Sequence, residues 1–232
     1  VIFDIVDEEL EKYEYMIRGA DLVTTASEPM KDLIESEYSV KTEVIRQYID
    51  YLKAPLPKRL HTKGSDLKIV FDTSPSNLED ILICKSALKK LREKHRFQLY
   101  YIAGKEPTQK DLGIGMDHIK WNPDELSINL QQMDIAIAPQ GNNLKPRSKL
   151  LTAIAHNLPV VCSDIPSYRD LAQKTGTLEF ICREQDDWLT ALDKMFDPLV
   201  RNEYMDKTRD FIWKYHGEEY LTKQWINLLS RI

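Results

Sequence analysis

Cysteine is scarce in this sequence, which has three in 232 residues: Cys84, Cys162 and Cys182. Each lies in an apolar run, and no two have the spacing of metal ligands, so neither a disulfide framework nor a zinc site is expected. Buried free thiols in a reducing cytoplasm are the simplest interpretation. The five histidines are scattered as well, and we therefore expect no metal and no cofactor.

Long apolar runs and an excess of positive charge are also missing. No apolar stretch approaches the roughly 18 residues of a membrane-spanning helix, and no charged-then-apolar leader begins the sequence. We expect a cytoplasmic protein, either free or peripheral to the inner face of the membrane. Lys and Arg total 32 against 37 Asp and Glu, and the resulting net charge of −5 argues against nucleic acid as a partner.

The glycine-rich motifs of common enzymes are absent too. There is no Gly-x-Ser-x-Gly nucleophile motif, no phosphate-binding P-loop and no Gly-x-Gly-x-x-Gly fingerprint. Gly113-Ile-Gly115 comes close to the last of these, but it lies in a polar loop without a strand before it. Among the carboxylates, Asp164 is interpreted as a turn residue before Pro166. The residues alone therefore identify no nucleophile and no general base.

Strand-like and helix-like patterns alternate along the chain, as they do in parallel sheets built from β-α-β units. Strands are predicted at residues 1–6, 21–26, 42–45, 67–71, 98–103, 118–121, 135–139, 160–163 and 178–182. Helices are predicted at residues 8–18, 28–38, 78–94, 124–133, 147–157 and 167–174, followed by three more of which the last covers 218–229. Ser27 is the expected N-cap of the helix at 28–38. The fold class is therefore α/β: a Rossmann-like doubly wound parallel sheet plus a partial second α/β domain.

The alternation is interrupted once, where Pro55, Pro57 and Gly64 predict a linker. Residues 66–215 form a complete domain, whereas the three strands in residues 1–50 are fewer than a parallel sheet usually has. We predict four parts: the end of a larger domain in 1–50, a linker in 51–65, the complete domain in 66–215, and a C-terminal helix in 216–232. The first residue, Val1, likewise predicts that upstream sequence is missing. An incomplete first sheet predicts a homo-oligomer or a partner chain that completes it.

The final helix has an apolar stripe at helical spacing. Its members are Leu221, Trp225, Leu228 and Leu229. We interpret the stripe as ordinary core packing, here against the first part of the chain.

The most informative segment is a buried strand that ends in a polar, cationic turn and then a helix. The turn contains Gly141, Asn142 and Asn143. The backbone N–H groups of the helix start are unpaired and carry the positive end of the helix dipole, so they would stabilise a phosphate. Lys145, Arg147 and Lys149 add positive charge, and the planar fork of Arg147 suits two phosphate oxygens. The alternative is a solvated basic helix start that binds nothing.

The same segment resembles the donor-binding, C-terminal half of bacterial GT-B glycosyltransferases of the family 4-like type. The family pattern is Lys-Ser-x-x-Lys-Leu-x-Glu, then Ala-x-Ala-x-Gly-x-Pro-Val-Val, then Ser-x-x-Pro-x-Tyr. The matching residues are Lys145, Lys149, Ala153, Ala155, Pro159, Val160, Val161, Ser163, Pro166 and Tyr168. Two positions depart from the pattern: Thr152 replaces the glutamate that holds the donor ribose, and Asn157 replaces the glycine. A threonine lacks the bidentate carboxylate that clasps a cis-diol.

The resemblance implies an enzyme that transfers a sugar, of hexosyltransferase type, from a nucleotide-diphosphate sugar to an acceptor in polysaccharide or glycan biosynthesis. The acceptor could be a carbohydrate, a lipid-linked molecule or a protein. Lys145, Arg147 and Lys149 would hold the diphosphate and stabilise it as it leaves, which is an electrostatic form of catalysis. Residues 20–27 and 44–50 resemble the end of the family's N-terminal, acceptor-binding domain, so the chain as given could bind donor and be inactive alone.

Further loops would surround the donor, because ligands of open α/β sheets lie beyond the carboxyl ends of the strands. The donor-binding candidates are Gly141, Asn142, Asn143, Ser148, Thr152, Ser74, Gly104, Lys120, Trp121 and Asn122. Gly141 to Asn143 would face the sugar and Thr152 the ribose. Trp121 would either stack on the base or pack in the core.

Two alternatives stay open. One is a non-catalytic binding or scaffolding module, which Thr152 and the absence of Arg and Lys from the loop at residues 72–77 both favour. The other is a GT-B-fold sugar-nucleotide epimerase, which would need acid and base groups that the sequence does not clearly offer.

Overall fold

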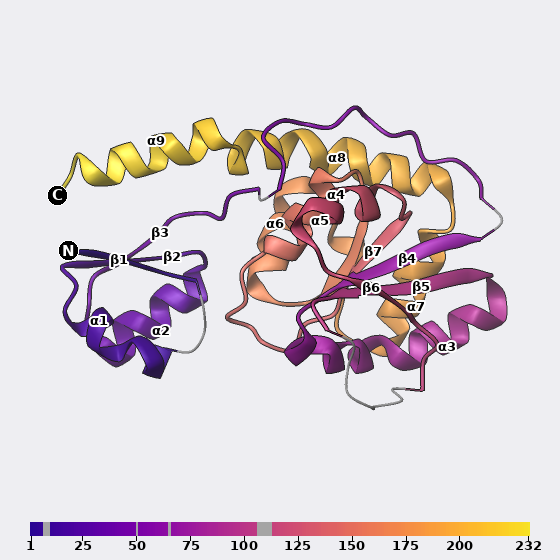
Figure 1. The fold of residues 1–232 in the computed structure, drawn as a ribbon, viewed down its shortest axis with the longest axis horizontal. Helices are drawn as coiled ribbons and strands as arrows, with labels where there is room; N and C mark the ends of the chain where they lie inside the picture. The colour runs from indigo at the N-terminus through magenta and orange to yellow at the C-terminus, as the bar shows by residue number, and fades with distance from the viewer. Residues whose placement is uncertain (7–9, 50, 65, 106–112) are drawn as a thin grey trace.

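The computed structural model describes residues 1–6, 10–49, 51–64, 66–105 and 113–232. Three predicted features lie outside these ranges: the start of the first helix, Asp50 at the end of the first part of the chain, and part of the loop after Gly104. The described residues form two sheets, one of three strands and one of six (Figure 1). All strand pairs are parallel, so the predicted α/β fold class is confirmed.

The small sheet has the order β1-β2-β3, with β1 (Ile2–Ile5), β2 (Leu22–Thr25) and β3 (Thr42–Val44). Its helices are a 3-10 turn η1 (Leu10–Tyr13) that continues into α1 (Glu14–Arg18), and α2 (Glu28–Tyr38). The Ser27 hydroxyl accepts a hydrogen bond from the Met30 N–H at 3.4 Å, as the N-cap prediction requires. The apolar residues of this part form a core cluster of their own, separate from that of the large sheet.

The large sheet has the order β6-β5-β4-β7-β8-β9. Its strands are β4 (Leu67–Asp72), β5 (Phe97–Ala103), β6 (Asp117–Lys120), β7 (Ile135–Ala138), β8 (Val160–Ser163) and β9 (Ile181–Cys182). The chain builds outward from β4 to β6 and then returns to β7 on the other side of β4. Such a reversal of strand order leaves a crevice at the carboxyl ends of the two central strands, where α/β proteins bind ligands.

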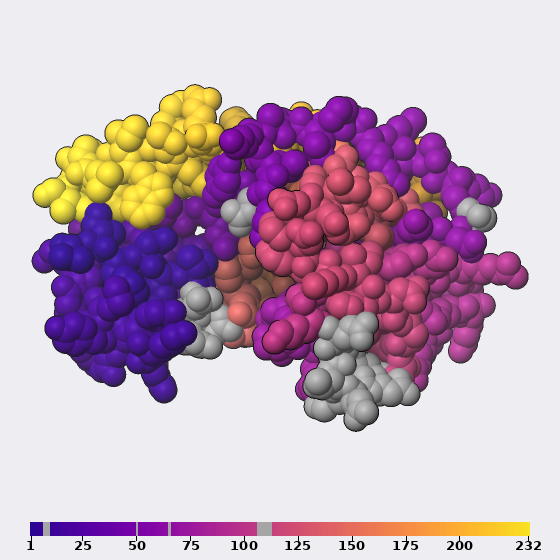
Figure 2. All heavy atoms as spheres, in the orientation of Figure 1, coloured from indigo at the N-terminus to yellow at the C-terminus, as the bar shows by residue number. Residues whose placement is uncertain are grey.

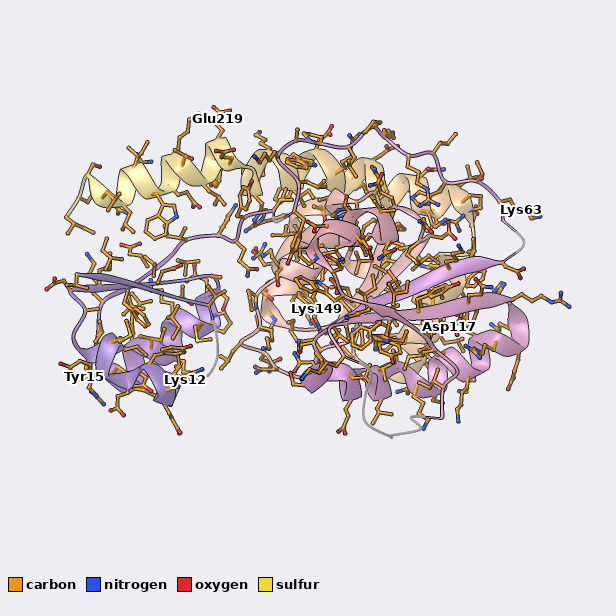
Figure 3. The ribbon with its side chains drawn as sticks, viewed as in Figure 1. Lys12, Tyr15, Lys63, Asp117, Lys149 and Glu219 are labelled. Carbon is orange, nitrogen blue, oxygen red and sulfur yellow. The ribbon has the colours of Figure 1, made fainter. Side chains whose placement is uncertain are left out.

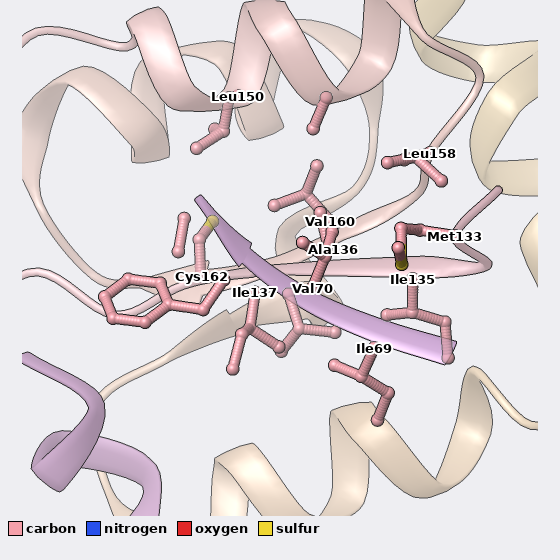
Figure 4. Close-up of a cluster of buried hydrophobic side chains, with 14 of the residues drawn as sticks. Ile69, Val70, Met133, Ile135, Ala136, Ile137, Leu150, Leu158, Val160 and Cys162 are labelled. Carbon is pink, nitrogen blue, oxygen red and sulfur yellow. The ribbon is translucent and has the colours of Figure 1, made fainter. Parts of the chain in front are cut away.

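Helices cover both faces of the large sheet (Figure 1). One face carries α3 (Lys85–Lys94) and α7 (Gln185–Lys194), and the other carries α4 (Pro123–Gln131), α5 (Ser148–Ala155), α6 (Pro166–Thr175) and α8 (Pro198–His216). The core between them is made of aliphatic side chains from the central strands and from α5 (Figure 4). Because the strands are buried on both faces, β7 and β8 have no exposed residue.

Two predicted elements have a different form. The helix predicted at residues 78–94 begins instead as a 3-10 helix, η2 (Pro75–Cys84), in which Leu78, Ile81 and Cys84 are buried. Their spacing of three is that of a 3-10 helix, and α3 begins where it ends. The strand predicted at 178–182 starts with a 3-10 turn, η3 (Leu178–Phe180), that places Phe180 edge-on against Tyr204 at 5.3 Å. Only β9 pairs with the sheet.

The segment between the sheets contains neither helix nor strand in its described residues 51–64, but side chains hold it on the large domain. The His61 Nε2 atom lies 3.1 Å from the Asn157 carbonyl oxygen, and the Asn157 amide donates to the Pro57 carbonyl at 3.1 Å. Arg201 donates to the Thr62 carbonyl at 2.8 Å. The segment is therefore bound along its length rather than free.

The last helix, α9 (Glu218–Leu229), reaches back over the small sheet (Figure 1). Leu221 and Leu228 are buried, as the apolar stripe predicts, and Trp225 is half-buried. Leu229, however, is 56% exposed, so its place in the packed stripe was wrong. It follows Leu228 by about 100° around the helix and so points away from the covered face. None of the helices that the structure describes is long and apolar enough to cross a membrane.

Candidate functional site

The two central strands end side by side at the crevice. β4 ends at Asp72 and β7 at Ala138, and their register pairs Val70 with Ala136. The segments that follow these strands enclose a pocket of about 250 Å³, which we call the switch-point pocket. It is lined by Val6, Gln47, Ser74, Asn77, Gln140, Lys145, Pro146, Ser148, Lys149 and Tyr168. The predicted candidates Ser74, Lys145, Ser148 and Lys149 thus meet in one pocket.

A hydrogen-bonded turn leads into the start of α5. The Asn142 side-chain oxygen accepts from the Leu144 N–H at 2.9 Å, and the Asn142 carbonyl accepts from the Lys145 N–H at 3.3 Å. The Ser167 hydroxyl then donates to the Lys145 carbonyl at 2.7 Å. Arg147 precedes the helix without a side-chain cap, and the first turn has no acidic residue. The helix dipole is therefore not compensated by its own first turn.

Lys149 is the most unusual residue of the pocket (Figure 3). Its Nζ atom is buried and has no hydrogen-bond partner among the described residues, and it lies 5.3 Å from the centre of the Phe71 ring. Burial lowers the pKa of Lys149, and the carboxylates of Asp80 and Asp72 oppose this effect. A cation is thus held at a helix N-terminus, where the helix dipole also disfavours it unless an anion is near.

Two half-buried carboxylates face this lysine. Burial raises the pKa of Asp72 to about 6, and Lys149 opposes the shift. Burial also raises the pKa of Asp80, whereas Lys149 and a hydrogen bond from the Gly141 backbone lower it. The sequence analysis missed Asp80, an acidic residue in the apolar run of η2. Its contact with the Gly141 backbone ties η2 to the turn before α5.

Arg147 lies apart from the two lysines. Its Nη2 atom donates to the Asp170 carboxylate at 2.8 Å, and its side chain is 11% exposed. It lines a second pocket, of about 150 Å³, which we call the junction pocket; Arg46, Asp170, Lys174 and the starts of α2 and α6 also line it. The structure does not bring Arg147 into the switch-point pocket, and its predicted contact with a diphosphate stays a prediction.

The other candidates lie around or outside the pocket. On the turn, Gly141 and Asn143 are exposed and Asn142 is half-buried. Thr152 is 8% exposed and lines, with Asp72 and Lys149, a separate cavity of about 10 Å³ beneath the pocket. Gly104, Lys120 and Trp121 are exposed at the ends of β5 and β6, and Asn122 caps α4 by accepting from the Asp124 N–H at 3.0 Å. Their predicted contacts with ribose and base stay predictions.

Three lining residues were missed, for two different reasons. Gln47 and Val6 come from the N-terminal part, and no local pattern marks them as neighbours of α5. Tyr168 belongs to the matched pattern and was not singled out; its Oη atom is buried without a hydrogen-bond partner among the described residues. Burial raises the pKa of Tyr168. Its hydroxyl therefore stays protonated and can donate a hydrogen bond.

Asp164 does not act as a free carboxylate. It pairs with Arg183 at 2.7 Å and also with Arg169. Both arginines line a larger hollow of about 410 Å³, beside Glu179 and Asp187. Asp164 pairs with both arginines, and the lining adds two further carboxylates, so the size of this hollow does not make it the better candidate site. No cluster of metal-ligating side chains is found in the part of the chain that the structure describes.

Comparison with solved structures shows the fold. A Staphylococcus aureus TarM mutant in complex with fondaparinux, α-GlcNAc-glycerol and UDP matches with a TM-score of 0.71 and 16% identity, over 95% of this chain and 46% of that one. WaaG, a glycosyltransferase involved in lipopolysaccharide biosynthesis, matches with a TM-score of 0.72 and 13% identity, over 98% and 74%. An Escherichia coli trehalose-6-phosphate structure with bound UDP-2-fluoro glucose matches with a TM-score of 0.70 and 14% identity, over 97% and 64%.

These matches confirm the predicted fold, which is that of part of a GT-B glycosyltransferase. This chain spans about half the length of the TarM structure and up to about three quarters of the others named here. No protein-family model matches the chain, and no curated protein matches it in sequence.

Proposed function

We propose that this chain binds a nucleotide-diphosphate sugar in the switch-point pocket and serves the transfer of that sugar to an acceptor. The observation that carries the proposal is the buried Nζ atom of Lys149 at the N-terminal end of α5, for which the described residues provide no hydrogen-bond partner. The carboxylates of Asp72 and Asp80 oppose the effect of burial on this cation only in part. A diphosphate would supply further negative charge and the missing hydrogen-bond acceptors. The structures of TarM and of the E. coli protein named above contain UDP or a UDP sugar.

In this proposal the diphosphate lies across the start of α5. The α5 N–H groups, Lys145 and Lys149 neutralise its charge, while Ser74 and Ser148 supply hydroxyl groups from opposite walls. The same groups stabilise the nucleotide diphosphate as it leaves the sugar, and they do so best because they are already oriented in a partly buried site. The turn at Gly141 to Asn143 faces the sugar, Thr152 lies toward the ribose, and the segment from Lys120 to Asn122 flanks the base.

Donor binding and transfer are separate steps of this proposal. The chain spans 46% of the length of TarM, so transfer can depend on groups beyond those described here. A non-catalytic binding module is the second candidate. The charge-free loop Thr73 to Asn77 favours it, because this loop offers no cation to a diphosphate.

Isothermal titration of the chain with UDP, GDP and their sugar conjugates tests the first step. We expect one of the nucleotides to bind with micromolar affinity. The variant Lys149→Met should bind that nucleotide about tenfold more weakly or worse, because one charge-assisted contact is lost. Lys90→Met is the matched control: Lys90 lies on α3, is 3.8 Å from Asp186 and lines neither pocket. A folded chain that binds no nucleotide contradicts the proposal. Binding without release of sugar to water or acceptor favours the non-catalytic module.

A further inference from the structure

The junction pocket lies where the N-terminal part meets the large domain. β2 and β3 of the small sheet end at it, and the start of α6 faces them. The space-filling view shows the molecule hollowed between these two parts (Figure 2). Because ligands of parallel sheets lie beyond the carboxyl ends of the strands, the position of this pocket suits a binding site of the small sheet.

Positive charge exceeds negative charge around this pocket. Arg147 and Lys174 share one carboxylate, that of Asp170, at 2.8 and 2.7 Å. Arg46 is in no ion pair within the described ranges; its guanidinium carbon lies 5.8 Å from the centre of the Tyr220 ring. Glu28 is the only other carboxylate in the lining, and it is exposed. Three cations thus face two carboxylates.

The Arg147 guanidinium uses only part of its hydrogen-bonding capacity. Nη2 donates to Asp170, whereas Nη1 is buried and has no partner among the described residues. Buried donors of this kind are rare in folded proteins, because the lost contact with water is not replaced. An anion with several oxygen atoms in the junction pocket would satisfy Nη1 and also balance the charge of Arg46.

The nearby residue His216 lies within reach of the charges of all three cations. It is fully buried, and its Nδ1 donates a hydrogen bond to the Gln47 carbonyl oxygen at 2.8 Å. Burial first, and then the charges of Arg147, Arg46 and Lys174, lower the pKa of His216 to about 4. All three cations therefore act on one point beside the pocket.

The junction pocket and the switch-point pocket share a wall. Pro146 and Ser148 line the switch-point pocket, and Arg147 between them lines the junction pocket. In the same way Gln47 lines one and Arg46 the other. A ligand in the junction pocket would therefore lie beside a donor in the switch-point pocket, which is where an acceptor must be.

We propose that the junction pocket binds a phosphate group of the acceptor, through Arg46, Arg147 and Lys174. This proposal rests on the proposed function, since an acceptor needs a donor beside it. A phosphomonoester fits the chemistry: it is compact and strongly charged, and its oxygens match the planar fork of an arginine. The donor's own diphosphate is the other possible source of the phosphate, and the experiment separates the two.

The test is isothermal titration with inorganic phosphate and with methyl phosphate, each with and without saturating UDP. We expect both probes to bind in the presence of UDP. The variant Arg46→Gln/Lys174→Gln should weaken their binding by about tenfold or more and change UDP affinity by less than about twofold. Lys90→Gln/Lys207→Gln is the matched control, because both lysines lie on exposed helix faces in surface ion pairs.

Each other result overturns the proposal in a recognisable way. If UDP displaces the phosphate, or if only the variant Lys149→Met loses phosphate binding, the phosphate binds in the switch-point pocket instead. If inorganic phosphate binds and methyl phosphate does not, the junction pocket cannot hold a phosphate group that is attached to an acceptor. If neither probe binds, the junction pocket is not a phosphate site. If phosphate binds but no nucleotide does, the proposed function fails, and with it the acceptor role. Thermal unfolding checks that the double variant is folded; if it is not, Lys174→Gln alone repeats the test.

Discussion

The ammonium nitrogen of Lys149 lies 5.3 Å from the centre of the Phe71 ring, at the end of the central strand β4. The ring face attracts the cation, but it cannot replace the hydrogen bonds that the ammonium had in water. The contact therefore offsets only part of the cost of burying the charge. The placement of this cation therefore suits the binding of an anion better than it suits stability.

Replacing this lysine with an uncharged residue of similar shape separates the two roles. We expect Lys149→Met to be at least as stable as the wild type in urea unfolding, because a desolvated cation is removed and the apolar stem is kept. Nucleotide binding should be lost in the same variant. A fall in the free energy of unfolding of more than about 2 kcal/mol would instead show that Lys149 is needed to neutralise Asp72 and Asp80.

The half-buried Asp72 predicts a stability change with pH. Its pKa is raised from 3.8 to about 6, so between these values the native state holds a proton that the unfolded chain has lost. Stability therefore falls as pH rises through this window, by about 3 kcal/mol in total. We expect Asp72→Asn to be more stable than the wild type at pH 7, with the difference shrinking toward pH 4. An equal difference at both pH values would contradict the assignment to this carboxyl group.

His61 predicts a dependence of the opposite sign. Burial, with the charges of Arg59 and Arg201, lowers the pKa of His61 from 6.5 to about 4. In this range the unfolded chain binds a proton that the native state does not, so stability falls as pH is lowered from about 6.5 to 4. His61→Gln should keep a hydrogen-bond donor near the Asn157 carbonyl. In this variant the free energy of unfolding, measured in urea at several pH values, should fall less between pH 6.5 and 4 than in the wild type. The pKa of His216 is also lowered to about 4, so we expect His216→Gln to reduce the loss of stability at acid pH in the same way.

Asn157 predicts how its position tolerates substitution. Its φ of 61° is left-handed, and its amide donates to the Pro57 carbonyl at 3.1 Å. Asn157→Gly loses the hydrogen bond and relaxes the backbone, whereas Asn157→Ala loses the bond and strains the backbone. We expect the alanine variant to be about 1 kcal/mol less stable than the glycine variant in urea unfolding. Equal stability of the two would mean that the left-handed conformation is not kept in the variants.

Local patterns were enough for most of the elements. The helix at residues 28–38 was predicted with its N-cap because Ser27 acts on a backbone N–H only three residues away. The asparagine at the family's glycine position fits for a similar reason, since asparagine tolerates the left-handed region better than most residues. The 3-10 form of η2 was missed, although its buried residues at 78, 81 and 84 carry the signal.

The sequence by itself determined the α/β alternation, the cationic turn before α5 and the family resemblance, because each depends on residues close together in the chain. Only the tertiary structure decided which charges share a pocket. Arg147 and Lys149 are two residues apart, yet Asp170 holds the arginine in the junction pocket while Lys149 is buried beside Phe71. Gln47 reaches the same wall from about 100 residues earlier in the chain. Side-chain direction depends on long-range partners such as these, and no local pattern encodes them.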